Sequence, residues 1–178
     1  MRGKNVDIGA DETPVVWYVD HDANGLNTGY SWQDAFPSIQ QAIDTASEGD
    51  QIVISEGIYA ENITIPNRSI ILQGLNPNNW QTVENTVIQS ADPNYPALLI
   101  LAAADKSIRI SGLAFVQGYT GVSIYNGAAP VFEYCAFKDN LSHGIEIFFG
   151  SPVFRYCQSV DNTGLGVKSY FSMAEFVN

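Results

Sequence analysis

The sequence predicts an all-β fold, a parallel β-helix with three short strands in each coil and an α-helix capping its N-terminal end. The main observation behind this prediction is a duplicated line. PVFEYCAFKDN begins at Pro130, and the similar PVFRYCQSVDN begins at Pro152, 22 residues later. A fixed period in the low twenties, made of short β-rich segments, is typical of stacked structural repeats. The repeat therefore predicts coils of about 22 residues.

Each copy holds three strand-like runs, such as AFK, GIEIF and PVFRY, separated by Asn, Gly, Ser and Pro. Leucine-rich repeats share this period, but their Leu-x-x-Leu-x-Leu signature is absent. Earlier runs, among them QIVIS, SIILQ, ALLIL and SIRI, supply further coils, so we assign residues 51–178 to the β-helix. Residues 74–85 are expected to form a loop between two coils.

Equivalent residues on neighbouring coils should stack about 4.8 Å apart, the spacing of hydrogen-bonded strands. The repeated line then becomes a set of side-chain ladders running along the molecule. The expected stacks are Phe132 on Phe154 and Tyr134 on Tyr156 in the interior, and Asn140 on Asn162 along a turn.

Residues 15–50 are expected to form the N-terminal cap, built from a strand, a loop and a helix. The stretch 31–50 is the one strongly helical segment of the sequence, with Ile39, Ala42, Ile43 and Ala46 on one face. Ser31 and Asp34 resemble a capping box at its start. An open β-helix end exposes apolar rungs and unpaired backbone, which the helix would cover.

Composition and charge exclude several classes of protein. The 178-residue chain is long enough for one domain with a substantial core. Its net charge of −11 argues against binding to nucleic acid or to anionic membranes. No apolar run approaches the length of a membrane helix, and the first residues do not resemble a signal peptide.

Residues 16–65, VWYVDHDANG to ENITI, resemble the opening of bacterial right-handed parallel β-helix proteins of the pectin-lyase-like superfamily. VDIGADE at residues 6–12 resembles the closing signature of such domains, which implies that residues 1–14 are the tail of a preceding module. The resemblance implies a right-handed coil and a secreted or cell-surface protein of several modules, often carbohydrate-associated. The end of the sequence shows no capping signal, so further coils are expected beyond it.

The architecture carries several activities, so function must be argued from residues. SHGIEIFFGS faintly resembles the His-Gly-Ile segment of polygalacturonases, but no Asp-Asp pair stands one coil upstream. We therefore read His143 as a turn residue and assign no catalytic residue. Two alternatives stay open beside binding: a polysaccharide lyase or glycoside hydrolase with its catalytic residues on later coils, and a structural stalk or adhesin.

Several polar residues have partners at the repeat distance. Stacked on adjacent strands, opposite charges form pairs, and equivalent cysteines lie within reach of each other. Parallel side-chain directions favour free thiols over a disulfide. The pairs are Glu133 with Arg155, Glu146 with Lys168, and Cys135 with Cys157.

Calcium is the candidate metal, although no cofactor is required. Asp20, Asp22 and Asn24 match the first half of a calcium loop, without the bidentate Glu that would complete it. Asp139 stacked on Asp161 is a second candidate, because two adjacent carboxylates repel unless a cation, a proton or solvent relieves them. Solvated turn aspartates are the simpler interpretation of that pair.

The predicted binding surface is polysaccharide-directed and lies on the outer face of the coils. Alternation in GVSIY, GIEIF and GVKSY places Tyr125, Phe148 and Tyr170 in an outward stripe, with Glu146 and Lys168 beside it. Aromatic rings with flanking hydrogen-bonding groups suit pyranose rings, and exposed apolar area often marks a contact site. The alternative is that these rings close a corner of the coil.

Overall fold

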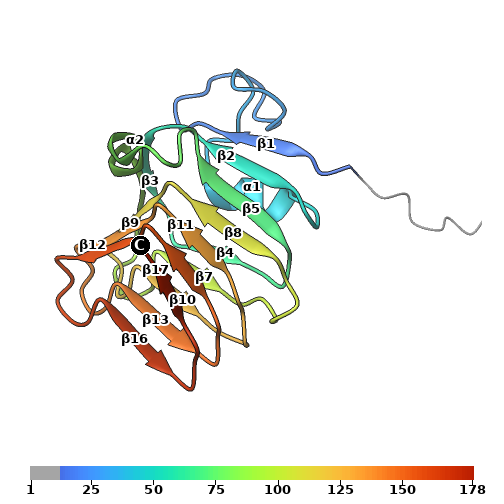
Figure 1. The fold of residues 1–178 in the computed structure, drawn as a ribbon. Helices are drawn as coiled ribbons and strands as arrows, with labels where there is room; N and C mark the ends of the chain where they lie inside the picture. Colours follow the sequence, from blue (N-terminus) through green and yellow to red (C-terminus); the bar gives the residue numbers. More distant parts are fainter. Residues whose placement is uncertain (1–12) are drawn as a thin grey trace, which may run out of the picture.

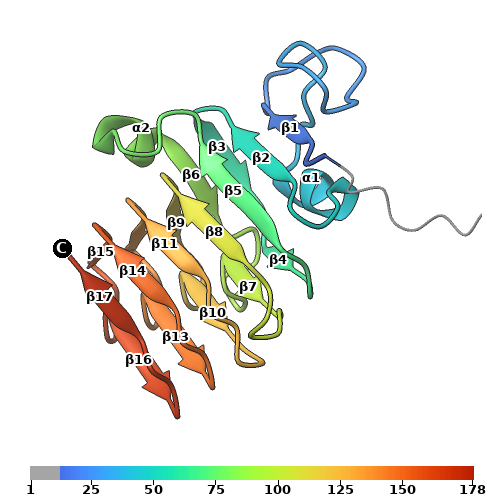
Figure 2. The ribbon, with the colours of Figure 1, turned by 45° about the vertical axis from the view of Figure 1, so that its right-hand side comes forward.

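A computed structural model describes residues 13–178, which wind into stacked coils of parallel strands (Figure 1). Three parallel sheets run along the stack, and each strand pairs with the strand one coil away, which confirms the predicted parallel β-helix. The segment 6–12 lies outside the described residues. Figure 2 shows the order of the coils, with β1 (Val16–Val19) and the cap at one end and β17 (Glu175–Val177) at the other.

The three sheets each take one strand from most coils. The first sheet runs in the order β1, β2 (Gln51–Ile54), β5 (Ile70–Gly74), β8 (Ile108–Ser111), β11 (Val131–Glu133), β14 (Val153–Arg155) and β17. The second contains β4 (Ile63–Ile65), β7 (Leu98–Ile100), β10 (Val122–Ile124), β13 (Ile145–Phe148) and β16 (Val167–Tyr170). The third contains β3 (Gly57–Ala60), β6 (Thr86–Gln89), β9 (Ala114–Val116), β12 (Ala136–Lys138) and β15 (Gln158–Val160).

Stacked phenylalanines fill the interior of the later coils. Phe132 pairs in register with Phe154, and both are buried, as predicted. Their ring centroids lie 5.1 Å apart, and Phe176 continues the stack at the same distance. Phe137 meets both Phe132 and Phe154 edge to face. The sequence is therefore repeated because each side chain in the interior packs against the equivalent side chain of the neighbouring coil.

The prediction that Tyr134 and Tyr156 fill the interior is wrong. Their rings do stack, at 4.9 Å, but they do so outside the coil, where Tyr156 is 47% exposed. Both residues have a φ of 52°, in the left-handed region. This conformation turns the chain at a corner and interrupts the in–out alternation of the strand, so that Cys135 points inward instead.

Left-handed residues recur at every corner of the later coils. Each corner repeats this conformation on successive coils, which shows that the winding of the coil imposes it. The series are Gly112, Tyr134 and Tyr156 after the first sheet; Gln117, Asp139 and Asp161 after the third; and Asn126, Phe149 and Phe171 after the second.

The predicted asparagine ladder is confirmed. Asn140 is buried, and its side-chain amide donates to Oδ1 of Asn162 at 2.9 Å. Its own Oδ1 accepts the backbone N–H of Gly118 at 3.0 Å, one coil earlier. A Cβ at Gly121 would lie 2.6 Å from the carbonyl oxygen of Gly144, so the coils approach closely here. The ladder thus ties three successive turns together.

The capping helix is shorter than predicted. α1 spans Ile39–Thr45 and begins at the N-cap Ser38, not near Ser31. Phe36 is extended and bridges to Val19, and the residue before a proline disfavours helix, so Pro37 sets the start. The expected apolar face is buried. Ser31 still accepts the N–H of Asp34 at 3.1 Å, but this contact closes a turn in the loop before the helix.

Residues 74–85 are not wholly a loop. Their second half forms a short helix, α2 (Trp80–Asn85), whose N-cap Asn79 accepts the N–H of Gln81. Val83 is buried against the third sheet, and Trp80 lies edge-on to Tyr134 with 6.2 Å between the ring centroids. The insertion therefore packs on the outside of the coils (Figure 2).

Asp50 joins the cap to the first coil. Its buried carboxylate accepts the backbone N–H groups of Val15 and Ser47 and the indole N–H of Trp17, at 2.7–2.8 Å. Burial alone would raise the pKa of Asp50, but these three hydrogen bonds outweigh it and hold the pKa below its ordinary value of 3.8.

We expect Asn140→Ala to lower the free energy of unfolding by about 3 kcal/mol, because the buried Gly118 N–H loses its acceptor. Urea denaturation followed by circular dichroism measures this. Asn94→Ala is the matched control, since Asn94 is exposed and bonds to Asp92 alone among the described residues. A loss no larger than that of the control would contradict the ladder's role.

The acid sensitivity of the fold should depend on Asp50. A carboxyl group with a lowered pKa in the folded state stabilises the fold above its unfolded pKa, and this stabilisation is lost as pH falls toward the folded pKa. Wild-type stability should thus drop as pH falls below about 4, and Asp50→Asn should be less stable at neutral pH with a flatter acid dependence. Thermal unfolding across this pH range checks it, with the exposed Asp105→Asn as control. An unchanged acid profile in Asp50→Asn would refute the assignment.

Candidate functional site

Two columns of side chains cover the outer face of the second sheet. The interior side of this sheet is formed by buried residues of β10 and β13, namely Val122, Ile124, Ile145 and Ile147. The alternate residues of the strands point outward. The register sets Ser123 beside Glu146 and Glu146 beside Lys168, which makes one outward column. The second column is the predicted aromatic stripe, which the structure brings together as Tyr125, Phe148 and Tyr170.

The aromatic column, which we call the outer ladder, is a face-to-face stack. Ring centroids of Tyr125 and Phe148 lie 4.7 Å apart with an interplanar angle of 9°, and those of Phe148 and Tyr170 lie 4.8 Å apart at 8°. Nearly parallel rings this close must overlap through their faces. Both faces of Phe148 are therefore occupied by its neighbours. Only the two end rings of the ladder keep a face that another ring of the ladder does not cover.

The charged column beside the ladder is paired, as the repeat spacing predicts. Lys168 Nζ lies 3.6 Å from a carboxylate oxygen of Glu146, and Arg155 lies 3.2 Å from Glu133 on the first sheet. Lys168 also lies 5.1 Å from the ring centroid of Tyr170. Solvent screens these partly exposed pairs, so they shape the surface more than they stabilise it.

A groove opens at the end of the outer ladder that is nearer the cap. Its volume is about 350 Å³. Tyr125 forms one side, and Tyr95 stands on a loop before β7 with 60% of its surface exposed. The remaining lining is mostly apolar. The lining residues are Tyr95, Pro96, Leu99, Leu101, Ser123 and Tyr125.

Sequence reasoning missed Tyr95, Leu99 and Leu101. The run ALLIL carries a signal, since alternation around the inward Leu98 and Ile100 leaves Leu99 and Leu101 outward. The sequence alone could not place Leu101 beside Tyr125, because that requires the register of β7 with β10. In this register Leu98 pairs with Val122, so the separation between equivalent residues of the two strands departs from the 22-residue period. No sequence pattern marks Tyr95.

The first calcium candidate gains a residue in the structure. His21 joins Asp20 and Asp22, and one ligating atom from each of these residues lies within 4.8 Å of the others. The group sits on an exposed turn, where Asp20 already accepts the N–H of Asp22 at 3.0 Å. Calcium prefers oxygen ligands, so the imidazole shifts this donor set toward transition metals. Calcium at Asp20, Asp22 and Asn24 stays a prediction.

The second calcium candidate has a conformational role of its own. Asp139 and Asp161 are exposed, and both take the left-handed conformation, with φ of 57° and 55°. Aspartate tolerates this region better than most residues, because its short side chain can hydrogen-bond locally. Stacked aspartates therefore suit this corner without a cation, and calcium there also stays a prediction.

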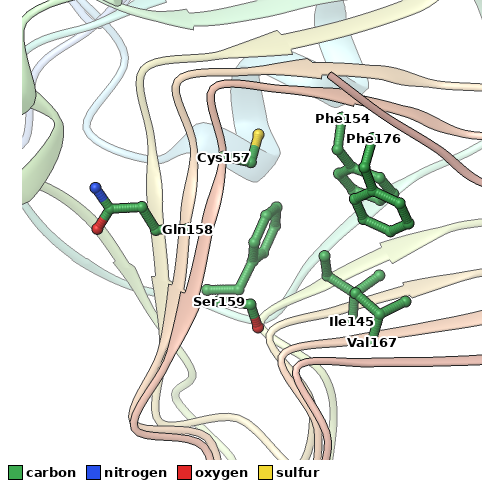
Figure 3. A pocket seen from close by; sticks show the side chains of 8 residues that line it. Ile145, Phe154, Cys157, Gln158, Ser159, Val167 and Phe176 are labelled. Atoms are coloured by element: carbon green, nitrogen blue, oxygen red, sulfur yellow. The ribbon is translucent and has the colours of Figure 1, made fainter. Parts of the chain in front are cut away.

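His143 is used structurally. Its Nδ1 accepts the backbone N–H of Leu165, one coil later, at 2.9 Å. Cys135 and Cys157 are free thiols, as predicted. Cys157 lines a hollow of about 220 Å³ at the last coil, among Phe154, Phe176 and Val167 (Figure 3). This hollow is the end of the same apolar stack that fills the coils, so we assign it no separate function.

The three parallel sheets and their matched side-chain ladders define a β-helix repeat protein. The family model for right-handed β-helix regions matches residues 55–178, so the chain belongs to the right-handed β-helix family. No curated protein matches the chain. No helix within residues 13–178 is long and apolar enough to cross a membrane. The bacterial source and the closer resemblance to the pectin-lyase-like superfamily stay predictions.

The two thiols should differ in reactivity. Cys135 is fully buried, and this burial raises the pKa of its thiol well above the ordinary value, whereas Cys157 is partly exposed at the hollow. A thiol-reactive disulfide reagent should modify one cysteine in the native protein and both after unfolding. Cys157→Ser should abolish the native reaction. Equal native reactivity of both thiols would contradict the packing of Cys135.

Proposed function

We propose that this chain is a polysaccharide-binding module of a secreted or cell-surface protein, and that the outer face of its second sheet is the contact surface. The observation that carries the proposal is the outer ladder, Tyr125 on Phe148 on Tyr170, which ends in an apolar groove. The three rings of the ladder are half-buried, and the groove adds Tyr95 and Leu101, which are exposed. Exposed apolar area of this kind often marks a contact site. Membership of the right-handed β-helix family is consistent with a polysaccharide-related module.

The chemistry of this face suits a sugar polymer. Aromatic rings offer apolar contact to the C–H groups of a pyranose, and Glu146 and Lys168 offer hydrogen bonds to its hydroxyl groups. The strands hold all of these side chains on one rigid sheet, so little conformational entropy is lost on binding. The face also follows the long axis of the stack, which suits an extended chain.

A glycan array tests the proposal. The wild-type protein should bind one or more polysaccharides. Tyr125→Ala should weaken that binding by roughly tenfold, since the substitution removes the end ring of the ladder. Tyr156→Ala is the matched control, because Tyr156 is an exposed, stacked tyrosine at a different corner of the coil. Binding with calcium and with a chelator in parallel would reveal the metal predicted at the turn holding Asp20 and Asp22.

Two results would count against the proposal. A folded protein that binds no glycan would leave the outer ladder as packing and would make this segment a scaffold, as in a stalk. Equal losses in Tyr125→Ala and in Tyr156→Ala would place the contact surface elsewhere.

A further inference from the structure

We propose that the groove between Tyr95 and Tyr125 is a binding site for one neutral pyranose ring of the polysaccharide, with these two tyrosine rings as its aromatic sides. This inference rests on the proposed function, because it names the part of the surface that holds a sugar and the class of sugar that it takes. The groove volume of about 350 Å³ falls at the lower end of the range for small-molecule sites, about 300–1,000 Å³.

The aromatic column ends at Tyr125, beside the groove. Phe148 covers one face of Tyr125. The other face points toward the preceding coil, where Leu101 holds the equivalent position and also lines the groove. The stack of Tyr134 on Tyr156 differs at its end ring. There Trp80 of α2 lies edge-on against the end ring Tyr134. Within residues 13–178 no aromatic ring other than Phe148 packs against Tyr125, so the part of its ring that lines the groove is not stacked on another ring.

The opposite side of the groove is held in place by hydrogen bonds. The loop that carries Tyr95 is fixed by Asn62, whose amide donates to the carbonyl of Pro96 at 2.9 Å and whose Oδ1 accepts the N–H of Asp92 at 2.7 Å. The carbonyl of Tyr95 accepts the N–H of Tyr119 at 2.9 Å. The groove is therefore formed before a ligand arrives, and the cost of ordering the loop is already met by folding.

The floor of the groove has no polar group in need of a partner. Leu99 and Leu101 are apolar, and the hydroxyl of Ser123 is bonded to that of Thr120 at 2.7 Å. A sugar ring would lay its C–H face on this floor and turn its hydroxyl groups outward. The hydroxyls of Tyr95 and Tyr125 have no protein hydrogen-bond partner among the described residues, so they can bond to those groups.

The charges around the groove favour a neutral sugar over a uronate. Asp92 lies in the loop of Tyr95, and Glu146 is one coil away from Ser123. Lys168 stands one coil further on and is already paired with Glu146. The net charge of −11 adds a long-range repulsion of anions. No cation from the described part of the chain lines the groove, and the carboxylates of the adjacent loop and coil disfavour a bound carboxylate.

Isothermal titration calorimetry tests the inference with two kinds of probe. The neutral probes are cellohexaose, xylohexaose and mannohexaose, and the acidic probe is hexagalacturonate. We expect at least one neutral probe to bind, with an affinity that changes little with ionic strength, because no charge is engaged. Tyr95→Ala should weaken it at least about fivefold. Tyr119→Ala is the matched control, since Tyr119 is an exposed neighbour that does not line the groove.

The remaining outcomes separate the inference from the proposed function. Neutral binding that is lost in Tyr170→Ala but kept in Tyr95→Ala would overturn the groove and leave the outer face as the contact surface. Tighter binding of hexagalacturonate than of every neutral probe would overturn the sugar class. No binding of any probe by the folded wild-type protein would overturn both. Because Tyr95 is 60% exposed, its removal should leave the thermal unfolding unchanged, and this is measured alongside.

Discussion

The hydrogen bonding of each strand to the strand one coil away is the constraint on which this structure depends. It fixes neighbouring coils at the spacing of paired strands, so every side chain meets the side chain at the equivalent position of the next coil. An apolar residue must then stack on an apolar residue and a buried amide on a buried amide. Phe132 on Phe154 and Asn140 on Asn162 satisfy this requirement in the interior.

The same constraint acts on the outer surface, where folding does not require it to produce an aromatic column. Tyr125, Phe148 and Tyr170 stack as regularly as the interior phenylalanines do, yet they stand outside. Stacking covers the ring faces within the column, so only the end rings have a face that no other ring of the column covers. An aromatic column therefore offers few ring faces to a ligand, and at Tyr125 an end ring of the column lines a groove.

Much of the fold could be predicted from the sequence, because residues that recur at a fixed spacing occupy equivalent positions on successive coils. The interior stack, the asparagine ladder and both ion pairs follow from the 22-residue offset alone. The outward position of Tyr134 could not be predicted. Its left-handed φ turns the side chain to the other side of the coil, and no sequence pattern marks such a φ. The groove could not be predicted from the sequence either. The register of β7 with β10 departs from the 22-residue period, and the loop of Tyr95 is held by hydrogen bonds to Asn62, which is distant in sequence.

A crystal structure of the protein with a neutral hexasaccharide bound would locate the sugar on the coils directly. We expect one pyranose ring in the groove between Tyr95 and Tyr125, with the rest of the sugar chain extending along the outer face of the second sheet. A sugar found only at the hollow of the last coil, or only against Tyr134 and Tyr156, would contradict it.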